Sequence, residues 1–100
     1  MPKFSMTVPH NLSQQEATDR LKRLLEFVKD AYKDKYKDLQ EAWGENSLTS
    51  SFKTMGLTIK GKVDVEANQV KIDSDLPFAA MMFKGQIEKT LREQLSKTLA

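Results

Sequence analysis

The sequence has 100 residues, of which 39% are hydrophobic and 30% charged, and we expect residues 1–100 to form one domain. This composition is too apolar for a disordered chain and too polar for an integral membrane protein. Sixteen Lys and Arg residues against fourteen Asp and Glu residues leave a net charge of +2, which argues against a nucleic-acid partner. With no cysteine and one histidine, the chain has no disulfides, thiol nucleophiles, thiolate metal sites or histidine clusters.

The N-terminal residues and the longest apolar run bear on localisation. Met1–Met6 lacks the apolar run of a signal peptide. The longest near-apolar stretch, Leu76–Phe83, is eight residues long, whereas a helix needs roughly 20 to cross a bilayer. We therefore expect a cytoplasmic protein without a transmembrane segment.

A short strand and a long helix are the first elements expected along the chain. Apolar and polar residues alternate over Phe4–Val8, which is typical of a half-buried strand. Ser13–Glu16 has the form of a capping box, in which Ser13 accepts a backbone N–H and Glu16 reaches back to the Ser13 N–H. Apolar residues then recur at steps of three and four, so the pattern predicts a helix over residues 14–35.

The charged run Lys29–Asp38 lies at the end of this helix and alternates in sign. Tyr32 and Tyr36 are one helical turn apart within it. A nucleic-acid-binding face would be mainly Lys and Arg, whereas here aspartates nearly cancel the lysines. We interpret the run as a solvated helix end whose two tyrosines pack inward.

From Leu39 the apolar period changes to two, and turns divide the chain into four expected strands. They run from Leu39 to Trp43, from Leu48 to Phe52, from Leu57 to Val65 and from Val70 to Leu76. This pattern predicts an antiparallel meander with one apolar face. In the last hairpin one register places apolar pairs inside and opposite charges outside. Its pairs are Val65 with Val70, Val63 with Ile72, Asp64 with Lys71, Lys62 with Asp73, and Lys60 with Asp75.

Pro77 precedes a second helix, expected over Phe78–Ala100, where apolar residues recur every four positions. Gly85 inside it predicts a close approach to another backbone, for which a strand near Gly61 is the expected partner. The fold class is therefore α+β, with the order β-α-β-β-β-β-α. Two helices cover one face of an antiparallel meander.

Residue types that serve catalysis do not gather into a motif. His10 lies in a connection between the first strand and the first helix, where we expect a loop residue or a local hydrogen-bond partner. The alternative is that His10 is the base of a hydrolase or isomerase. Asp64, Asp73 and Asp75 face lysines in the predicted register, which favours surface charge matching over acid–base or metal chemistry. We expect no catalytic, cofactor-binding or metal-binding residue and no enzymatic activity.

The run Leu76–Phe83 carries more apolar residues than one helix face can bury. Flexible methionines suit adaptable apolar contacts. Phe78, Met81 and Met82 are therefore the candidate apolar interaction surface. The alternative is that this run is a buried helix start, packed on the first strand and Trp43.

Several short segments, in this order and spacing, resemble the polyhydroxyalkanoic acid system proteins, small proteins of bacteria that store polyester granules. The segments are Pro9–Leu12, Trp43-Gly44, a strand ending in Phe52, Gly61–Val65, Val70–Ile72, Leu76–Phe78 and Lys84–Glu88. The resemblance implies an accessory role, either granule-associated or assisting polymer metabolism, and it brings no catalytic residues with it.

Two hypotheses follow from the residues and the resemblance. The first is a non-enzymatic accessory protein of polyhydroxyalkanoate metabolism, whose apolar surface contacts a polyester granule, a granule protein or a second copy in a homodimer. The alternative is a small binding module that holds an acyl-type ligand between the sheet and the C-terminal helix. Trp43, Ser50 and Gly61 would then face the ligand. The order of elements is similar to helix-grip folds, which hold apolar ligands in this way.

Overall fold

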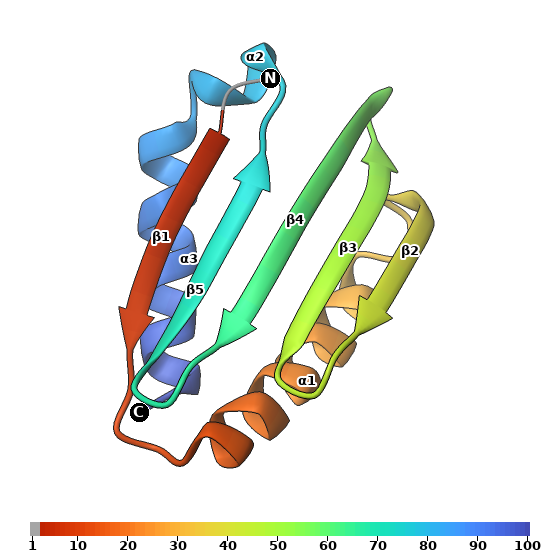
Figure 1. The fold of residues 1–100 in the computed structure, drawn as a ribbon. Coiled ribbons are helices and arrows are strands. Elements are labelled where there is room, and N and C mark those ends of the chain that lie inside the picture. Colours follow the sequence, from red (N-terminus) through yellow and green to blue (C-terminus); the bar gives the residue numbers. More distant parts are fainter. Residues whose placement is uncertain (1–2) are drawn as a thin grey trace.

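The computed structural model describes residues 3–100, which form five strands and three helices. Met1 and Pro2, part of the segment considered for a signal peptide, lie outside the described residues. The order β-α-β-β-β-β-α is confirmed, and the C-terminal helical region is in two pieces (Figure 1). The elements are β1 (Lys3–Pro9), α1 (Gln14–Ala31), β2 (Lys37–Trp43), β3 (Ser47–Thr54), β4 (Leu57–Val65), β5 (Gln69–Asp75), α2 (Phe78–Met81) and α3 (Lys84–Thr98).

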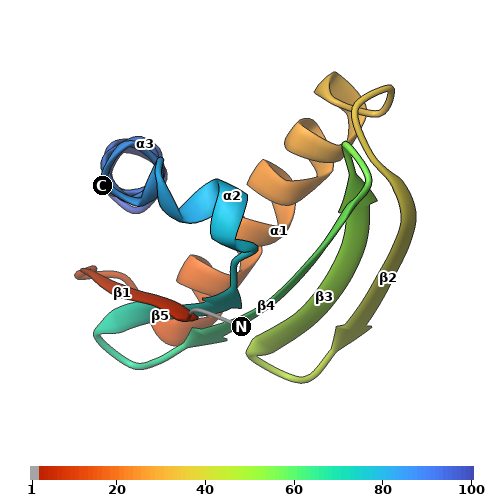
Figure 2. The same cartoon turned by 90° about the horizontal axis from the view of Figure 1, so that it is seen from above.

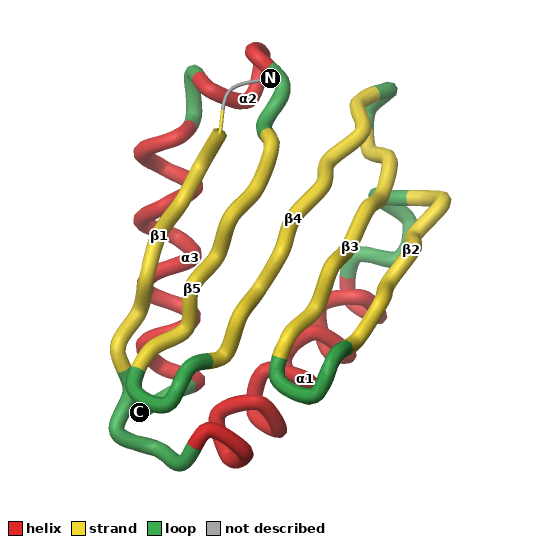
Figure 3. Tube along the Cα trace, viewed as in Figure 1, coloured by secondary structure: helices red, strands yellow, loops and turns green. Residues whose placement is uncertain are grey.

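The five strands form one antiparallel sheet in the order β1-β5-β4-β3-β2. Strands β2 to β5 are the expected meander, joined by short turns (Figure 3). Strand β1 pairs with β5, with Val8 opposite Val70. The sheet is curled, and its concave face carries both long helices, α3 along β1 and β5 and α1 crossing toward β3 and β2 (Figure 2).

The β4–β5 hairpin has the predicted register: Val65 lies opposite Val70, and Lys62 lies opposite Asp73. The charged side chains on its outer face make other contacts than those expected. Lys62 Nζ lies 3.7 Å from Asp64 on its own strand, and Asp73 accepts a hydrogen bond from Ser5 on β1. The alternation of apolar and polar residues therefore determined the register. The long lysine side chains can still contact carboxylates other than the one directly opposite them.

Helix α1 begins at the predicted cap, where Ser13 Oγ accepts the Glu16 backbone N–H at 3.1 Å. The second half of the expected capping box is replaced by an ion pair. The Glu16 carboxylate accepts a hydrogen bond from Arg20 Nε at 2.9 Å, one turn further along the helix. This pair is an ordinary i, i+4 contact on a helix surface.

Helix α1 ends at Ala31, four residues before the predicted end. The reason is the position of Tyr36, whose ring lies edge-on to Phe52 of β3 with centroids 6.1 Å apart. Tyr36 Oη also donates to the Lys29 carbonyl oxygen at 3.1 Å. The chain has to leave the helix before Tyr36 in order to place this ring on the sheet.

The expected C-terminal helix is broken between Met81 and Lys84. Phe83 has φ −106° and ψ 13°, outside the α-helical region, so the chain turns there and α3 runs back along β1. The close approach predicted at Gly85 is wrong. Within residues 3–100 no atom outside its immediate surroundings lies within 4 Å of the position that a Gly85 Cβ would occupy.

The buried core lies at one side of the molecule, between α3, the first half of α1 and the strands β1 and β5. Its members are apolar side chains that point to the concave face of the sheet or to each other from the helices. They are Phe4, Met6, Val8, Ala17, Leu21, Val65, Val70, Leu76, Leu95 and Leu99.

Candidate binding groove

The two halves of α1 relate differently to the sheet. The buried residues of α1, Ala17, Thr18 and Leu21, all lie in its first half. Val28 and Tyr32 lie two and three turns after Leu21 on the same helix face, yet they are 37% and 56% exposed. The second half of α1 therefore diverges from the sheet and leaves its apolar face uncovered.

Polar contacts attach the first half of α1 to the sheet. Gln14 Nε2 donates to the Val65 carbonyl oxygen at 2.7 Å. Asn46 Nδ2 donates to Thr18 Oγ1 at 2.8 Å, and Thr18 is completely buried. Buried polar groups that are hydrogen-bonded in this way define one position for the helix end. Because these contacts hold the first half of α1 on the sheet, the space between the helix and the sheet lies beside β2 and β3, under the second half of α1.

The space left by this divergence is a groove of about 520 Å³. This volume lies within the range of small-molecule binding sites. Most side chains around the groove are apolar and come from α1, α3 and the concave face of the sheet. They are Phe4, Leu25, Val28, Tyr32, Tyr36, Leu39, Leu48, Phe52, Ile59, Val63, Ile72, Leu76, Ile87 and Leu91.

One ionic contact spans the groove between α1 and the edge strand β2. Lys29 Nζ lies 2.8 Å from Glu41 Oε1 and 2.8 Å from Glu26 Oε1. Hydrogen bonds to Glu26 and Glu41 raise the pKa of Lys29 above the ordinary lysine value. Both Lys29 and Glu41 line the groove, and we call their contact the Lys29–Glu41 clasp.

Three hydroxyl groups from the strands also line the groove, those of Ser50, Thr54 and Ser74. Thr54 Oγ1 donates to the Lys35 carbonyl oxygen at 2.7 Å, and Ser74 Oγ donates to the Lys60 carbonyl oxygen at 2.8 Å. Ser50 is half-buried and lies opposite Gly61 in the β3–β4 register. Within residues 3–100 the Ser50 side chain has no hydrogen-bond partner, so its hydroxyl is free to donate to a ligand in the groove.

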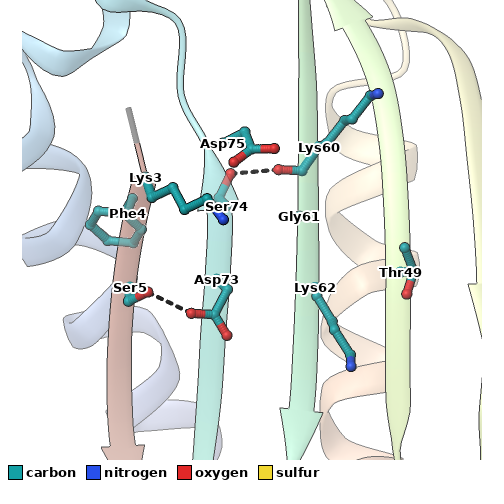
Figure 4. A pocket seen from close by; sticks show the side chains of 10 residues that line it. All are labelled: Lys3, Phe4, Ser5, Thr49, Lys60, Gly61, Lys62, Asp73, Ser74 and Asp75. Atoms are coloured by element: carbon teal, nitrogen blue, oxygen red, sulfur yellow. Dashed lines mark hydrogen bonds between the residues drawn. The ribbon is translucent and has the colours of Figure 1, made fainter. Parts of the chain in front are cut away.

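A second, shallower hollow of about 290 Å³ lies on the convex face of the sheet (Figure 4). Its rim is polar and includes Lys60, Lys62 and Asp73. Four residues line both the hollow and the groove: Phe4, Gly61, Lys62 and Ser74. A Cβ at Gly61 would lie 3.5 Å from the Asp73 carbonyl oxygen, so this position has room for a methyl group.

The residues predicted to face an acyl ligand are only partly brought together. Ser50 and Gly61 line the groove, but Trp43 is not among its lining residues. Trp43 is 41% exposed, and Lys22 Nζ lies 5.1 Å from the centroid of its ring. This is a cation–π contact between α1 and the end of β2. The groove also lies mainly against α1, whereas the prediction placed the ligand against the C-terminal helix.

The predicted apolar surface divides between exposed and packed residues. Phe78 is 80% exposed and Met82 is 84% exposed, and Phe83 beside them is also exposed. Met81 instead packs against the core. We call Phe78, Met82 and Phe83 the apolar patch. It lies in and just after α2, at the end of the molecule where the β3–β4 turn also lies (Figure 1).

Prediction from the sequence missed the groove residues on α1, because Leu25, Val28 and Tyr32 continue the same apolar stripe as the core residues. A signal was nevertheless present in the strands that face them. Inward-facing positions of β2 and β3 hold Glu41 and Ser50, which cannot complete a dry core with that stripe.

His10 is buried and both of its ring nitrogens contact backbone groups. Nδ1 accepts the Leu12 N–H at 3.1 Å, so Nε2 carries the proton and donates to the Glu66 carbonyl oxygen at 3.0 Å. The His10 backbone N–H donates to the Asn68 carbonyl oxygen at 3.0 Å. His10 therefore attaches the β1–α1 connection to the β4–β5 turn, and it is not among the residues that line the groove.

Within residues 3–100 no helix is both long and apolar enough to cross a membrane. In the same part of the chain no group of three or more His, Cys, Asp or Glu side chains is placed to hold a metal ion.

Comparison with known proteins gives one family. The model of the family described as "Putative polyhydroxyalkanoic acid system protein" matches residues 4–99, a range that includes the whole groove and the apolar patch. A search of curated proteins gave no significant match. On the strength of the family match, the chain belongs to the polyhydroxyalkanoic acid system proteins.

Proposed function

We propose that this chain is a non-enzymatic accessory protein of polyhydroxyalkanoate metabolism that holds a segment of an apolar acyl or polyester chain in the groove. The observation that carries the proposal is the uncovered apolar face of α1 above the sheet, where Val28 and Tyr32 stay exposed on the face that buries Leu21. A helix face of this kind, set over an apolar floor, is the geometry of a pocket for a hydrocarbon chain. Such a role belongs in the bacterial cytoplasm, where storage polyester would be handled.

The test is a titration with ten-carbon aliphatic chains, decanoate and methyl decanoate, followed by amide chemical shifts in NMR spectra. We expect saturable shifts at groove residues such as Leu25 and Ile59, and no shifts at core residues such as Val8 and Val70. If neither chain shifts the groove residues, the proposal is wrong.

A matched pair of variants on α1 identifies the site. Val28→Asp places a carboxylate among the apolar groove residues, and we expect it to weaken binding of either chain at least about tenfold. Phe27→Asp is the control, because Phe27 is 70% exposed and is not among the groove-lining residues. Equal effects of the two substitutions would place binding outside the groove.

The apolar patch supports a second candidate function, docking on the surface of a polyester granule. Monomeric proteins rarely gather exposed large apolar side chains, and here Phe78, Met82 and Phe83 lie within six residues of sequence. This surface is independent of the groove, whose lining residues do not include these three.

Co-sedimentation with purified polyhydroxyalkanoate granules tests this candidate. The variant Phe78→Asp with Met82→Asp should lose co-sedimentation and keep its fold, because both side chains are exposed. Phe27→Asp is again the control. Met81 is left unchanged because it packs against the core.

Size-exclusion chromatography of the same variants distinguishes self-association from granule docking. If the variant loses a dimer but co-sediments unchanged, the patch is a self-association surface, which contradicts docking on granules.

A further inference from the structure

The charges around the groove indicate which chemical class of chain it accepts. Four side chains that are charged at neutral pH belong to its lining residues: Lys29, Lys35, Glu41 and Lys62. Lys62 occupies an outward-facing strand position, and its Nζ lies 3.7 Å from Asp64 on the convex face. Lys35 is exposed in the connection between α1 and β2. The charged pair that joins α1 to the strands across the groove is therefore the Lys29–Glu41 clasp.

Within the clasp, the positive charge of Lys29 is already paired with carboxylates. Lys29 contacts two carboxylates, Glu26 and Glu41, so the three side chains together carry one negative charge at neutral pH. An ionised carboxylate entering beside Glu41 would be repelled and would also lose its hydration among apolar residues. An uncharged chain is not repelled by Glu41 and loses no ionic hydration on entering the groove.

Among the three strand hydroxyl groups on the floor of the groove, one is available as a hydrogen-bond donor to such a chain. The hydroxyl protons of Thr54 and Ser74 are used in bonds to backbone carbonyl oxygens. Ser50 has no partner within residues 3–100, and Gly61 opposite it leaves room above the sheet. A donor set in an apolar surface is suited to an uncharged acceptor, and the carbonyl oxygen of an ester is such an acceptor.

We infer that the groove binds an uncharged, ester-containing aliphatic chain, that is, a segment of polyester rather than a free acid, and that the Ser50 hydroxyl donates to an ester carbonyl oxygen. This inference rests on the proposed function and specifies the ligand of the same groove. The clasp provides selection against charged chains, and Ser50 provides selection for the carbonyl.

Three chains of similar length test the inference: decanoate, methyl decanoate, and decyl methyl ether, which lacks the carbonyl group. We expect methyl decanoate to bind at least about tenfold more tightly than decanoate at pH 7. Ser50→Ala should weaken binding of methyl decanoate about three- to tenfold and leave binding of the ether unchanged. Ser51→Ala is the matched control, because Ser51 occupies the neighbouring, outward-facing position of β3.

A charge variant tests the part played by the clasp. Glu41→Gln leaves Lys29 with Glu26 alone, so the preference for the methyl ester over decanoate should fall at least about threefold. Tighter binding of decanoate than of methyl decanoate by the unaltered protein would overturn the inference, as would a Ser50→Ala effect that is equal for ester and ether. Either result leaves the proposed function standing, whereas absence of binding by all three chains overturns both.

Discussion

The two sides of the concave face are covered in different ways. On one side β1 and β5 lie under α3 and the first half of α1, and residues such as Val8 and Val70 are fully buried. On the other side β2 and β3 face the second half of α1 across the groove, and Glu41 and Ser50 occupy inward-facing positions. One helix therefore serves both sides. The first half of α1 packs on the apolar strands, and its second half diverges from the strands that carry Glu41 and Ser50.

The largest effects are expected from truncating side chains in the packed side. Leu95→Ala removes a buried core side chain, and we expect the free energy of unfolding to fall by about 2–5 kcal/mol. Ile59→Ala in the groove removes a half-buried side chain and should cost only about 1 kcal/mol. Urea denaturation measures both, and equal losses would break the distinction between the two sides.

His10 should matter next, because its hydrogen bonds hold the connection that leads from β1 into α1. His10→Ala leaves the Leu12 N–H and the Glu66 carbonyl oxygen without these partners, and the expected loss in stability is about 1–3 kcal/mol. Asn11→Ala is the control, since Asn11 is exposed and should change stability by less than about 0.5 kcal/mol. A His10→Ala variant as stable as the Asn11→Ala variant would contradict the anchoring role.

The Lys29–Glu41 clasp should contribute less, because it lies at the surface of the open side. Lys29→Met is expected to cost at most about 1 kcal/mol at pH 7. The pKa of Lys29 is raised in the folded state, so its contribution is complete below the ordinary lysine pKa of 10.5 and is lost as the pH rises through the higher folded value. The difference in the free energy of unfolding between the unaltered protein and Lys29→Met should therefore be constant from pH 7 to 9 and narrow above 10.5.

A stability difference that grows at alkaline pH would contradict this assignment. Lys33→Met, at an exposed lysine in the α1–β2 connection, is the control.

The smallest effects come from two glycines, one on each side. Gly85→Ala in α3 meets open space and should raise the free energy of unfolding by about 0.5–1 kcal/mol. Gly61→Ala also has room, because the nearest atom to its Cβ is the Asp73 carbonyl oxygen at 3.5 Å, and it should raise stability by about 0.5 kcal/mol. Calorimetry checks both values. Only Gly61→Ala should change ligand binding, because Gly61 alone of the two lines the groove.

Much of the fold could be predicted from short-range patterns. The β4–β5 register followed from alternation, since Val63 and Val65 had to face Ile72 and Val70 for both strands to present one apolar face. The N-cap of α1 followed from the hydroxyl of Ser13. The early end of α1 and the break at Phe83 could not be predicted in this way, because each depends on where a distant strand receives the chain.

The candidate site was only partly predictable for a related reason. Ser50 and Gly61 were identified because small residues that face the core can leave space for a ligand. Val28 and Tyr32 were interpreted as core, because an apolar helix stripe has the same spacing whether it covers a sheet or lines a groove. Trp43 was predicted to face the ligand, but it is not among the groove-lining residues and its ring contacts Lys22 instead.

The sequence by itself determined the order of the elements, the hairpin register and the family, because these depend on residues that are neighbours along the chain or across one turn. Only the tertiary structure decided the distance between α1 and the sheet. That distance depends on the contacts that attach one helix end, such as Gln14 with Val65, and on the Lys29–Glu41 clasp near the other. Each of these contacts joins α1 to a strand that comes later in the chain. No local sequence pattern therefore specifies the groove between α1 and the sheet.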